Sequence, residues 1–329
     1  MLQTENLRSL YSPTLDRKNT CIVAACDDKY AFCLFAALQS LWKYSPLLAQ
    51  QADIWIAGVH LSAASKRILS TIPHVRLLEY AFPGTLPDTE AITNFTAASF
   101  ARYECFKLLT LYTQVLYLDS DILIRQELAP VFNQITTGLG LVPDPDITPA
   151  GRNFSRPING FAMQTRGFNS GFMALNRGGK WHSQGAEITR WLYQQTRKQA
   201  TYLIYPDQGI INLALQQFHI QPTVLVDSYN CPASRPNREL KTAPIIHATG
   251  PRKFWCYYYF DEFYTSYTCW IKQGGAAVSV RKQDSPLYKW FIQKTGLDKY
   301  IFVQLCPDFI ARPHKALRFL IKKWLRCKF

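Results

Sequence analysis

The sequence contains an Asp-Ser-Asp tripeptide directly after a short apolar run, and its two carboxylates could bind a hard metal ion. Asp119 and Asp121 follow residues 115–118, Val-Leu-Tyr-Leu. Because alternate residues of an extended chain point to the same side, both carboxylates can converge on one cation. Mg²⁺ and Mn²⁺ suit such oxygen ligands, and phosphate oxygens can complete the shell. The alternative is a solvated acidic turn, since Asp-x-Asp alone is a weak motif.

A second group, His247, Gly250 and Lys253, lies within seven residues after the apolar run at 243–246. An imidazole can donate a nitrogen ligand to Mn²⁺, a glycine lets the backbone approach a phosphate, and a lysine ammonium neutralises it. A single histidine after a strand is more often structural. The three residue types together favour binding of a metal and a diphosphate.

Two further polar groups, at residues 169–171 and 207–208, could bind sugar hydroxyls, although each has a structural alternative. Asn169-Ser170-Gly171 and Asp207-Gln208 resemble turn sequences when taken alone. Asp207 could also be the N-cap of the helix that follows it. Arg102 lies on an expected helix, seventeen residues before Asp119. It could belong to the site, or it could be a surface or capping arginine of that helix.

Apolar runs that alternate with helical patterns predict the elements that position these residues. We expect strands at residues 21–26, 52–59, 75–80, 114–124, 138–146 and 168–176, with a short strand within 243–255. We expect helices at residues 30–43, 62–72, 98–112, 181–196 and 207–218. This order predicts an α/β fold with a largely parallel sheet, in which ligands bind beyond the carboxyl ends of the strands. Asp27-Asp28 and Asp119-Asp121 would lie at that edge, beside a long loop at 147–167 whose length is common in functional lids.

Charge and cysteine content restrict the class of protein. The net charge of +14 at pH 7 favours anionic partners such as nucleic acid, anionic lipid or phosphorylated ligands. The nine cysteines show no metal-finger spacing and several lie in apolar runs, which indicates a reducing compartment. We find no signal-peptide pattern at the N-terminus and no apolar run of about 18 residues that could span a membrane. These features predict a cytoplasmic protein that contacts membranes only from the surface.

The C-terminal residues have the pattern of a basic amphipathic helix. Seven lysines and arginines and no acidic residue lie between Arg312 and Phe329. Pro313 is a plausible helix start, and one apolar stripe follows it, formed by Leu317, Leu320, Ile321, Trp324 and Leu325. Such a helix is typical of the interface of an anionic membrane. The alternative is a terminal helix packed on the domain; a nucleic-acid tail would have no use for the stripe.

Taken in order, these motifs resemble the retaining glycosyltransferases of family 8, over roughly residues 20–256. The matching segments are CIVAACDDKYAFCLFAALQSLWKYSP, FARYECFKLL, LYLDSDILI, FNSGFMALN, YPDQGIINLAL and IIHATGPRKFW. Six motifs in the same order are much more specific than any one of them. Phe254 departs from the family's usual proline before the tryptophan, and loop 147–167 matches no motif, so Asp144 and Asp146 are only candidates for acceptor contacts.

The resemblance implies a single GT-A nucleotide-sugar domain at residues 19–275. It would follow a lead-in at 1–18 and precede a basic, helical, membrane-associating segment at 276–329. The implied roles are uridine binding by Ala25, Asp27 and Tyr30; Mn²⁺ or Mg²⁺ binding by Asp119, Asp121 and His247; pyrophosphate binding by Gly250 and Lys253; and donor-sugar contacts by Arg102, Asn169, Asp207 and Gln208. Ser120 would also contact the nucleotide sugar, and Gln208 and Asp207 would be the catalytic pair.

The function that this resemblance implies is retaining transfer of galactose or glucose from a UDP-sugar. The acceptor would be a hydroxyl of a glycan or lipid-linked molecule, such as lipopolysaccharide, and nucleic acid would not be a partner. The alternative is a basic nucleic-acid- or lipid-binding protein without catalysis, which the charge and the C-terminal segment support. No nucleic-acid recognition motif accompanies that charge.

Overall fold

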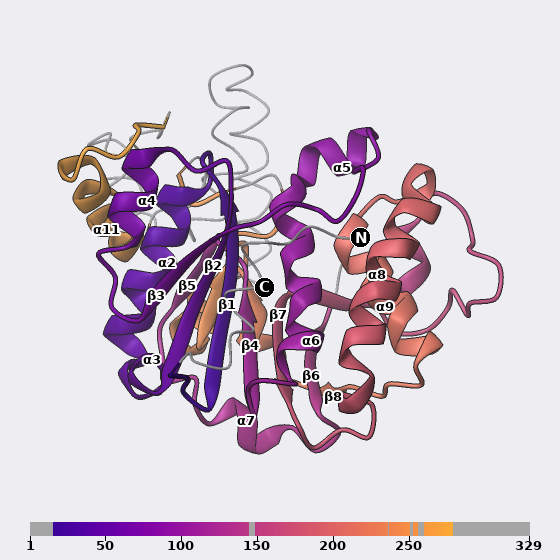
Figure 1. The fold of residues 1–329 in the computed structure, drawn as a ribbon. Coiled ribbons are helices and arrows are strands. Elements are labelled where there is room, and N and C mark those ends of the chain that lie inside the picture. Colours follow the sequence, from indigo (N-terminus) through magenta and orange to yellow (C-terminus); the bar gives the residue numbers. More distant parts are fainter. Residues whose placement is uncertain (1–15, 145–148, 236, 251–252, 256–259, 279–329) are drawn as a thin grey trace, which may run out of the picture.

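The computed structural model describes residues 16–144, 149–235, 237–250, 253–255 and 260–278. A seven-stranded sheet forms its centre (Figure 1). Its strands are β1 Thr20–Asp27, β2 Ala52–Val59, β3 Val75–Glu79, β4 Gln114–Leu118, β6 Leu139–Pro143, β7 Phe168–Asn176 and β8 Thr223–Val224. The strand order is β3-β2-β1-β4-β7-β6-β8. A second sheet has the order β5-β10-β9, with β5 Ile122–Ile124, β9 Cys231–Pro232 and β10 Ile245–His247.

The larger sheet is mixed and mostly parallel, as the sequence predicts. Strands β3, β2, β1 and β4 are parallel, β7 is antiparallel to both β4 and β6, and β8 is parallel to β6. The carboxyl ends of the four parallel strands therefore lie at one edge, where the chain leaves β1 at Asp27 and β4 at Leu118.

Helices cover both faces of this sheet (Figure 1). The helices are α2 Ala31–Tyr44, α3 Pro46–Gln51, α4 Ala63–Leu69, α5 Glu90–Phe95, α6 Glu104–Leu108, α7 Val131–Gln134, α8 Gly185–Gln199, α9 Pro206–Gln217, α10 Asn237–Thr242 and α11 Asp261–Lys272. Short 3-10 helices are η2 Ala97–Tyr103, η3 Ala150–Asn153, η4 His182–Gln184, η5 Ala200–Tyr202 and η6 Asp227–Asn230. Ser62 caps α4 by accepting a hydrogen bond from the backbone N–H of Ser65.

The sheet separates two hydrophobic cores, and alternate side chains of β1 point into one or the other. Ile22, Ala24 and Cys26 face α2 and α11, whereas Cys21 and Val23 face α6, α8 and α9. Burial on both faces explains why this strand is a continuous apolar run rather than an alternating one. The six cysteines among the described residues are all free thiols, and five of them are buried.

Two of the predicted elements are wrong in detail. The apolar run at 114–124 is not one strand, because the chain turns at Ser120 and passes from β4 of the large sheet to β5 of the small one. Both halves are buried, so hydrophobicity does not mark the break. Residues 98–112 form no single helix either: η2 ends at Tyr103 and α6 at Leu108. In η2, the Arg102 side chain donates to the backbone oxygen of Ser99 and turns into the protein interior.

Among the described helices, none is both long and apolar enough to cross a membrane. Most of the expected lead-in at 1–18 and of the basic segment at 276–329 lies outside the described residues, as does Asp146. The described part of loop 147–167 contains η3, whose Ala150 and Asn153 are buried.

Candidate functional site

Two acids and a histidine from three separate strand ends converge at the carboxyl edge of the sheet. Asp119 follows β4, Asp121 precedes β5, and His247 ends β10. One potential ligand atom from each side chain lies within 4.8 Å of the others. The His247 Nε2 atom is 3.2 Å from Asp121 Oδ1 and 3.6 Å from Asp119 Oδ2. The acids converge although the tripeptide is a turn rather than the extended segment we expected.

Hydrogen bonds fix which nitrogen of His247 faces the two acids. The backbone N–H of Gly171 donates to Asn169 Oδ1 (2.8 Å), and Asn230 Nδ2 donates to the same oxygen (2.7 Å). The Asn230 Oδ1 atom therefore faces His247 Nδ1, at 2.7 Å, and accepts its hydrogen. In a neutral imidazole, the form that binds a metal, Nε2 is therefore the nitrogen whose lone pair faces Asp119 and Asp121. Two carboxylates and an oriented imidazole fit a divalent cation such as Mn²⁺.

Gly171 of β7 lets the backbone lie against this group. A Cβ atom at Gly171 would be 2.4 Å from His247 Cε1 and 2.6 Å from Asp119 Oδ2. The backbone N–H of Asp119 donates to the Gly171 carbonyl oxygen at 2.9 Å. Any side chain at this position would displace the candidate ligands, so glycine is required here for close approach.

Lys253 places a positive charge beside the acids. Its Nζ atom donates to Asp121 Oδ2 and, at 2.9 Å, to the Ala248 carbonyl oxygen. Burial raises the pKa of the Asp121 carboxyl, but Lys253 and His247 outweigh it and hold the pKa below its usual range. Gly250 has a φ of +70°, which glycine adopts without strain. The Lys253 ammonium and the backbone of Gly250 thus lie at the same edge of the sheet as the two acids.

The residue after Lys253 departs from the family pattern, and the structure gives the reason. Phe254 is fully buried and packs edge-to-face on Phe260, with a ring-centroid distance of 5.4 Å, and against Phe263 of α11. Trp255 contacts Phe32 and Tyr30 with ring-centroid distances of 4.9 Å and 5.7 Å. Aromatic packing thus anchors the turn to α2 and α11.

Arg102 is buried at the centre of a second charged group, so the surface alternative is wrong. Its guanidinium lies 2.7 Å from Asp119 Oδ1 and 2.8 Å from Asp207 Oδ2, and it donates to Ser170 Oγ at 2.6 Å. Burial opposes its charge, but Asp119 and Asp207 raise the pKa of Arg102 above its usual value. The guanidinium also lies over the Tyr117 ring, 4.6 Å from its centroid.

Asp207 is part of this charged group and is not the N-cap of α9. The N-cap residue is Tyr205, and Asp207 lies in the first turn with its carboxylate on Arg102 and Ser170. Burial raises the pKa of Asp207, and Arg102 opposes that rise. The next residue, Gln208, is buried and donates from Nε2 to Asp144 Oδ2 at 3.2 Å.

The expected nucleotide residues lie at the same edge. The register pairs Ala24 with Leu118, which places Ala25 next to Asp119. The backbone N–H of Tyr30 donates to Asp27 Oδ1 at 3.1 Å, which joins the end of β1 to α2. Burial raises the pKa of Tyr30, and the charge of Lys253 opposes this. Ser120 is buried between the two acids.

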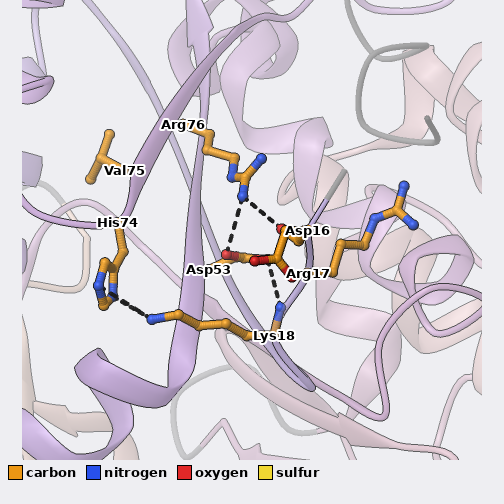
Figure 2. Close-up of a pocket in the computed structure, with 7 residues that line it drawn as sticks. All are labelled: Asp16, Arg17, Lys18, Asp53, His74, Val75 and Arg76. Carbon is orange, nitrogen blue, oxygen red and sulfur yellow. Dashed lines mark hydrogen bonds and ion pairs between the residues drawn. The ribbon is translucent and has the colours of Figure 1, made fainter. Parts of the chain in front are cut away.

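A charged pocket of about 250 Å³ lies at the opposite ends of β1, β2 and β3 (Figure 2). The Asp53 carboxylate accepts from the backbone N–H of Lys18 (3.2 Å) and from the Tyr112 hydroxyl (3.0 Å), and Arg76 lies 3.6 Å from it. The Lys18 ammonium contacts His74. The pocket therefore lies at the N-terminal ends of the strands, away from the candidate site.

Several residues that complete the site were not predicted from the sequence. Tyr117 donates to Asp119 Oδ1 at 3.1 Å, and its position two residues earlier on a strand was a usable signal. Ser170 lies within a motif that was recognised. Asn230 and Asn153 carry no local signal, because each acts through a partner far away in the sequence.

A model of Glycosyl transferase family 8 matches residues 21–258. The chain belongs to glycosyltransferase family 8. The family predicted from the six motifs is therefore confirmed, and membership favours an enzyme that transfers glycosyl groups over a non-catalytic binding protein. No curated protein matches the sequence.

Similar solved structures confirm the fold of this family 8 chain. The galactosyltransferase LgtC, solved with donor and acceptor sugar analogues, is 20% identical with a TM-score of 0.54, over 80% of this chain and 98% of LgtC. The apo structure of the bifunctional glycosyltransferase WbbM is 17% identical with a TM-score of 0.58, over 87% of this chain and 53% of WbbM. The chain thus matches only about half of WbbM. The shared architecture is the GT-A fold.

Proposed function

We propose that the protein is a retaining glycosyltransferase that moves a hexose, galactose or glucose, from a UDP-sugar to a hydroxyl of a glycan or lipid-linked acceptor. Lipopolysaccharide is an acceptor of this kind. The observation that carries the proposal is the convergence of Asp119, Asp121 and His247 beside Lys253, directly next to Asp207 and Gln208. Ligands for a cation, a positive charge for a diphosphate and polar groups for a sugar thus occupy one edge.

The residues divide into a nucleotide part and a sugar part. We assign the uridine to Ala25, Asp27 and Tyr30, the diphosphate to Gly250, Lys253 and Ser120, and the donor sugar to Arg102, Asn169, Asp207 and Gln208. Asp119, Asp121 and His247 would hold Mn²⁺ or Mg²⁺. A divalent cation bound there would supply Lewis-acid stabilisation of the leaving diphosphate. The Lys253 ammonium adds electrostatic stabilisation where negative charge develops.

Retention of configuration needs either a covalent intermediate or attack from the side that the leaving group vacates. Asp207 is engaged by Arg102 and Ser170, and an amide such as Gln208 is a poor nucleophile. We therefore favour same-face attack. The acceptor oxygen bonds to the anomeric carbon while the bond from that carbon to the phosphate oxygen breaks, and this phosphate oxygen takes the acceptor proton. Gln208 would stabilise positive charge at the reacting carbon.

The proposal is tested by measuring UDP release from several UDP-sugars with Mn²⁺, with Mg²⁺ and with a chelator. We expect metal-dependent turnover of UDP-galactose or UDP-glucose, and protection against thermal unfolding by UDP but not by AMP. Binding of nucleic acid without any UDP-sugar turnover would support the rival function.

Replacement of one candidate ligand tests the metal assignment. Asp121→Asn should lower turnover at least ~10²-fold, because a metal contributes several kcal/mol to transition-state stabilisation. Asp53→Asn is a matched control, since this carboxylate is equally buried but lies at the opposite end of the sheet. The assignment is wrong if a folded Asp121→Asn protein keeps near-normal activity.

A further inference from the structure

We propose that Asn153 is a positioning residue that, together with Asp144, orients the side-chain amide of Gln208 so that its carbonyl oxygen is the atom left for the donor sugar. Asn153 ends η3, in the loop to which the family motifs assign no role. The inference rests on the proposed function, which places Gln208 at the reacting carbon.

The orientation of the Asn153 amide follows from its neighbours. Its Nδ2 atom is 2.8 Å from the backbone oxygen of Ala150. A carbonyl oxygen can only accept, so the amino group of Asn153 faces Ala150 and its Oδ1 atom is the one that faces Gln208. The distance from Asn153 Oδ1 to Gln208 Nε2 is 3.1 Å.

A second acceptor completes the orientation of Gln208. The Asp144 carboxylate is buried, and its Oδ2 atom is 3.2 Å from Gln208 Nε2 and 3.1 Å from Asn169 Nδ2. Both hydrogens of the Gln208 amino group therefore have acceptors. Rotation of the amide by 180° would place its oxygen against two acceptor oxygens and lose both bonds. Within the part of the chain that the structure describes, no group donates to Gln208 Oε1.

Packing holds Asn153 rigidly against α9, the helix of Gln208. Asn153 is 0% exposed, and its backbone oxygen accepts from Ile204 N at 2.8 Å. A Cβ atom at Gly209 would lie 3.0 Å from Asn153 Cβ, so glycine lets η3 approach the helix closely. The described segment around Asn153 is thus packed directly against the helix that carries Gln208.

A double-mutant cycle separates this role from a merely structural one. Asn153→Ala should lower kcat about tenfold, the effect of one lost hydrogen bond that orients a reacting group, with the Kd for UDP unchanged within about twofold. In a Gln208→Ala background the same substitution should change kcat less than about twofold. Equal losses in both backgrounds, or a parallel loss of UDP affinity, would overturn the proposal.

Two further variants keep the test decisive. Asn176→Ala removes a half-buried amide whose side-chain hydrogen bonds within the described ranges go to Ile135 and Gly178, far from Gln208, and it should leave kcat unchanged. Asn153→Asp should keep kcat within about threefold, because burial beside Asp144 favours the neutral acid, which donates to Ala150 and accepts from Gln208 as the amide does. If Asn153→Ala does not fold, a folded, UDP-binding Asn153→Asp protein that loses more than tenfold in kcat overturns the proposal.

A measurement without turnover distinguishes failure of this inference from failure of the proposed function. The side-chain amide signal of Gln208 can be assigned by its disappearance in Gln208→Ala. Its hydrogens should exchange slowly with solvent in the wild type and at least about tenfold faster in Asn153→Ala. Unchanged exchange contradicts the role of Asn153 even in an active enzyme, whereas absent UDP release with the expected exchange contradicts only the proposed function.

Discussion

His247 shows how a single residue of the candidate metal site depends on an amide behind it. Asn230 accepts from His247 Nδ1 and is itself held by Asn169. Partners behind a ligand fix its tautomer and ring orientation, and they influence metal affinity nearly as much as the ligand does.

Loss of the Asn230 amide should therefore weaken metal binding. We expect Asn230→Ala to lower the affinity for Mn²⁺ at least about tenfold, because the imidazole loses the acceptor that orients it. Calorimetry with saturating UDP measures this affinity. Asn230→Asp keeps an acceptor for His247 Nδ1, so its affinity for Mn²⁺ should fall less than that of Asn230→Ala. Equal affinity of the wild type and Asn230→Ala would contradict the role.

Gln208 should affect the chemical step more than nucleotide binding. Its side chain contacts Asp144 and Asn153 rather than the residues that we assign to uridine. We expect Gln208→Ala to lower kcat while the Kd for UDP, measured by calorimetry, changes little. If UDP affinity falls as much as kcat, Gln208 lies outside the sugar part of the site.

The sequence identifies residues that act through local spacing and omits those that act through distant partners. Asp119 and Asp121 follow an apolar strand, and His247, Gly250 and Lys253 lie within one turn, so both groups could be predicted. Asn230 is 61 residues from Asn169, and Asn153 is 55 residues from Gln208. No local pattern encodes such pairs, because the packing of β7, η3 and α9 creates them.

At the level of elements, strands and helices were predictable where burial changes along the chain, and less so where it does not. Strand β2 has the predicted bounds Ala52–Val59, since polar residues flank it. The break between β4 and β5 was missed because the residues on both sides are buried. Which sheet a short strand joins depends on partners such as β10, and this cannot be deduced from the strand itself.

A carboxylate from the loop between β5 and α7 binds the first turn of helix α3. Glu127 accepts from the Ser45 hydroxyl at 2.6 Å and from the backbone N–H groups of Leu47 at 3.0 Å and Leu48 at 3.2 Å. These amides are unpaired within the first turn of a helix, and a negative charge there is favourable. Burial raises the pKa of Glu127, but the hydrogen bonds outweigh it and leave the pKa below its usual value.

Glu127→Gln should lower the free energy of unfolding at neutral pH by about 1 kcal/mol, typical of a lost helix cap. Because the folded-state pKa is depressed, this stabilisation is complete above the unfolded-state pKa and is lost as pH falls through the folded-state value. Urea unfolding of the wild type and of Glu127→Gln should therefore show a difference in free energy of unfolding that is largest at pH 7 and becomes smaller at lower pH. Glu79→Gln, at an exposed ion pair with Lys66, is the control and should have a much smaller effect. If the difference in free energy of unfolding between the wild type and Glu127→Gln does not depend on pH, the charge of Glu127 does not stabilise α3.

At the scale of the whole molecule, the basic segment raises the question of where the enzyme works. Residues 312–329 lie outside the described part of the structure, so this prediction depends on their sequence pattern alone. Basic residues near an anionic surface contribute about 1 kcal/mol each, and salt weakens that attraction.

Deletion of residues 312–329 should remove binding to anionic vesicles and leave UDP-sugar hydrolysis intact. Sedimentation with anionic and with neutral vesicles measures the first, and UDP release measures the second. A truncated protein that still sediments with anionic vesicles, or that unfolds, would show that the segment is not a membrane anchor.

The turn between β4 and β5 also limits how this sequence can evolve. The N–H of Asp119 donates to Gly171 in the large sheet, while the carbonyl oxygen of Asp121 accepts from Ala248 beside the small one. Each end of the turn is thus bound to a different sheet, and neither strand can absorb an extra residue without a change of register. An insertion or deletion between the two strands would therefore break one of these two anchors and move the candidate ligands apart.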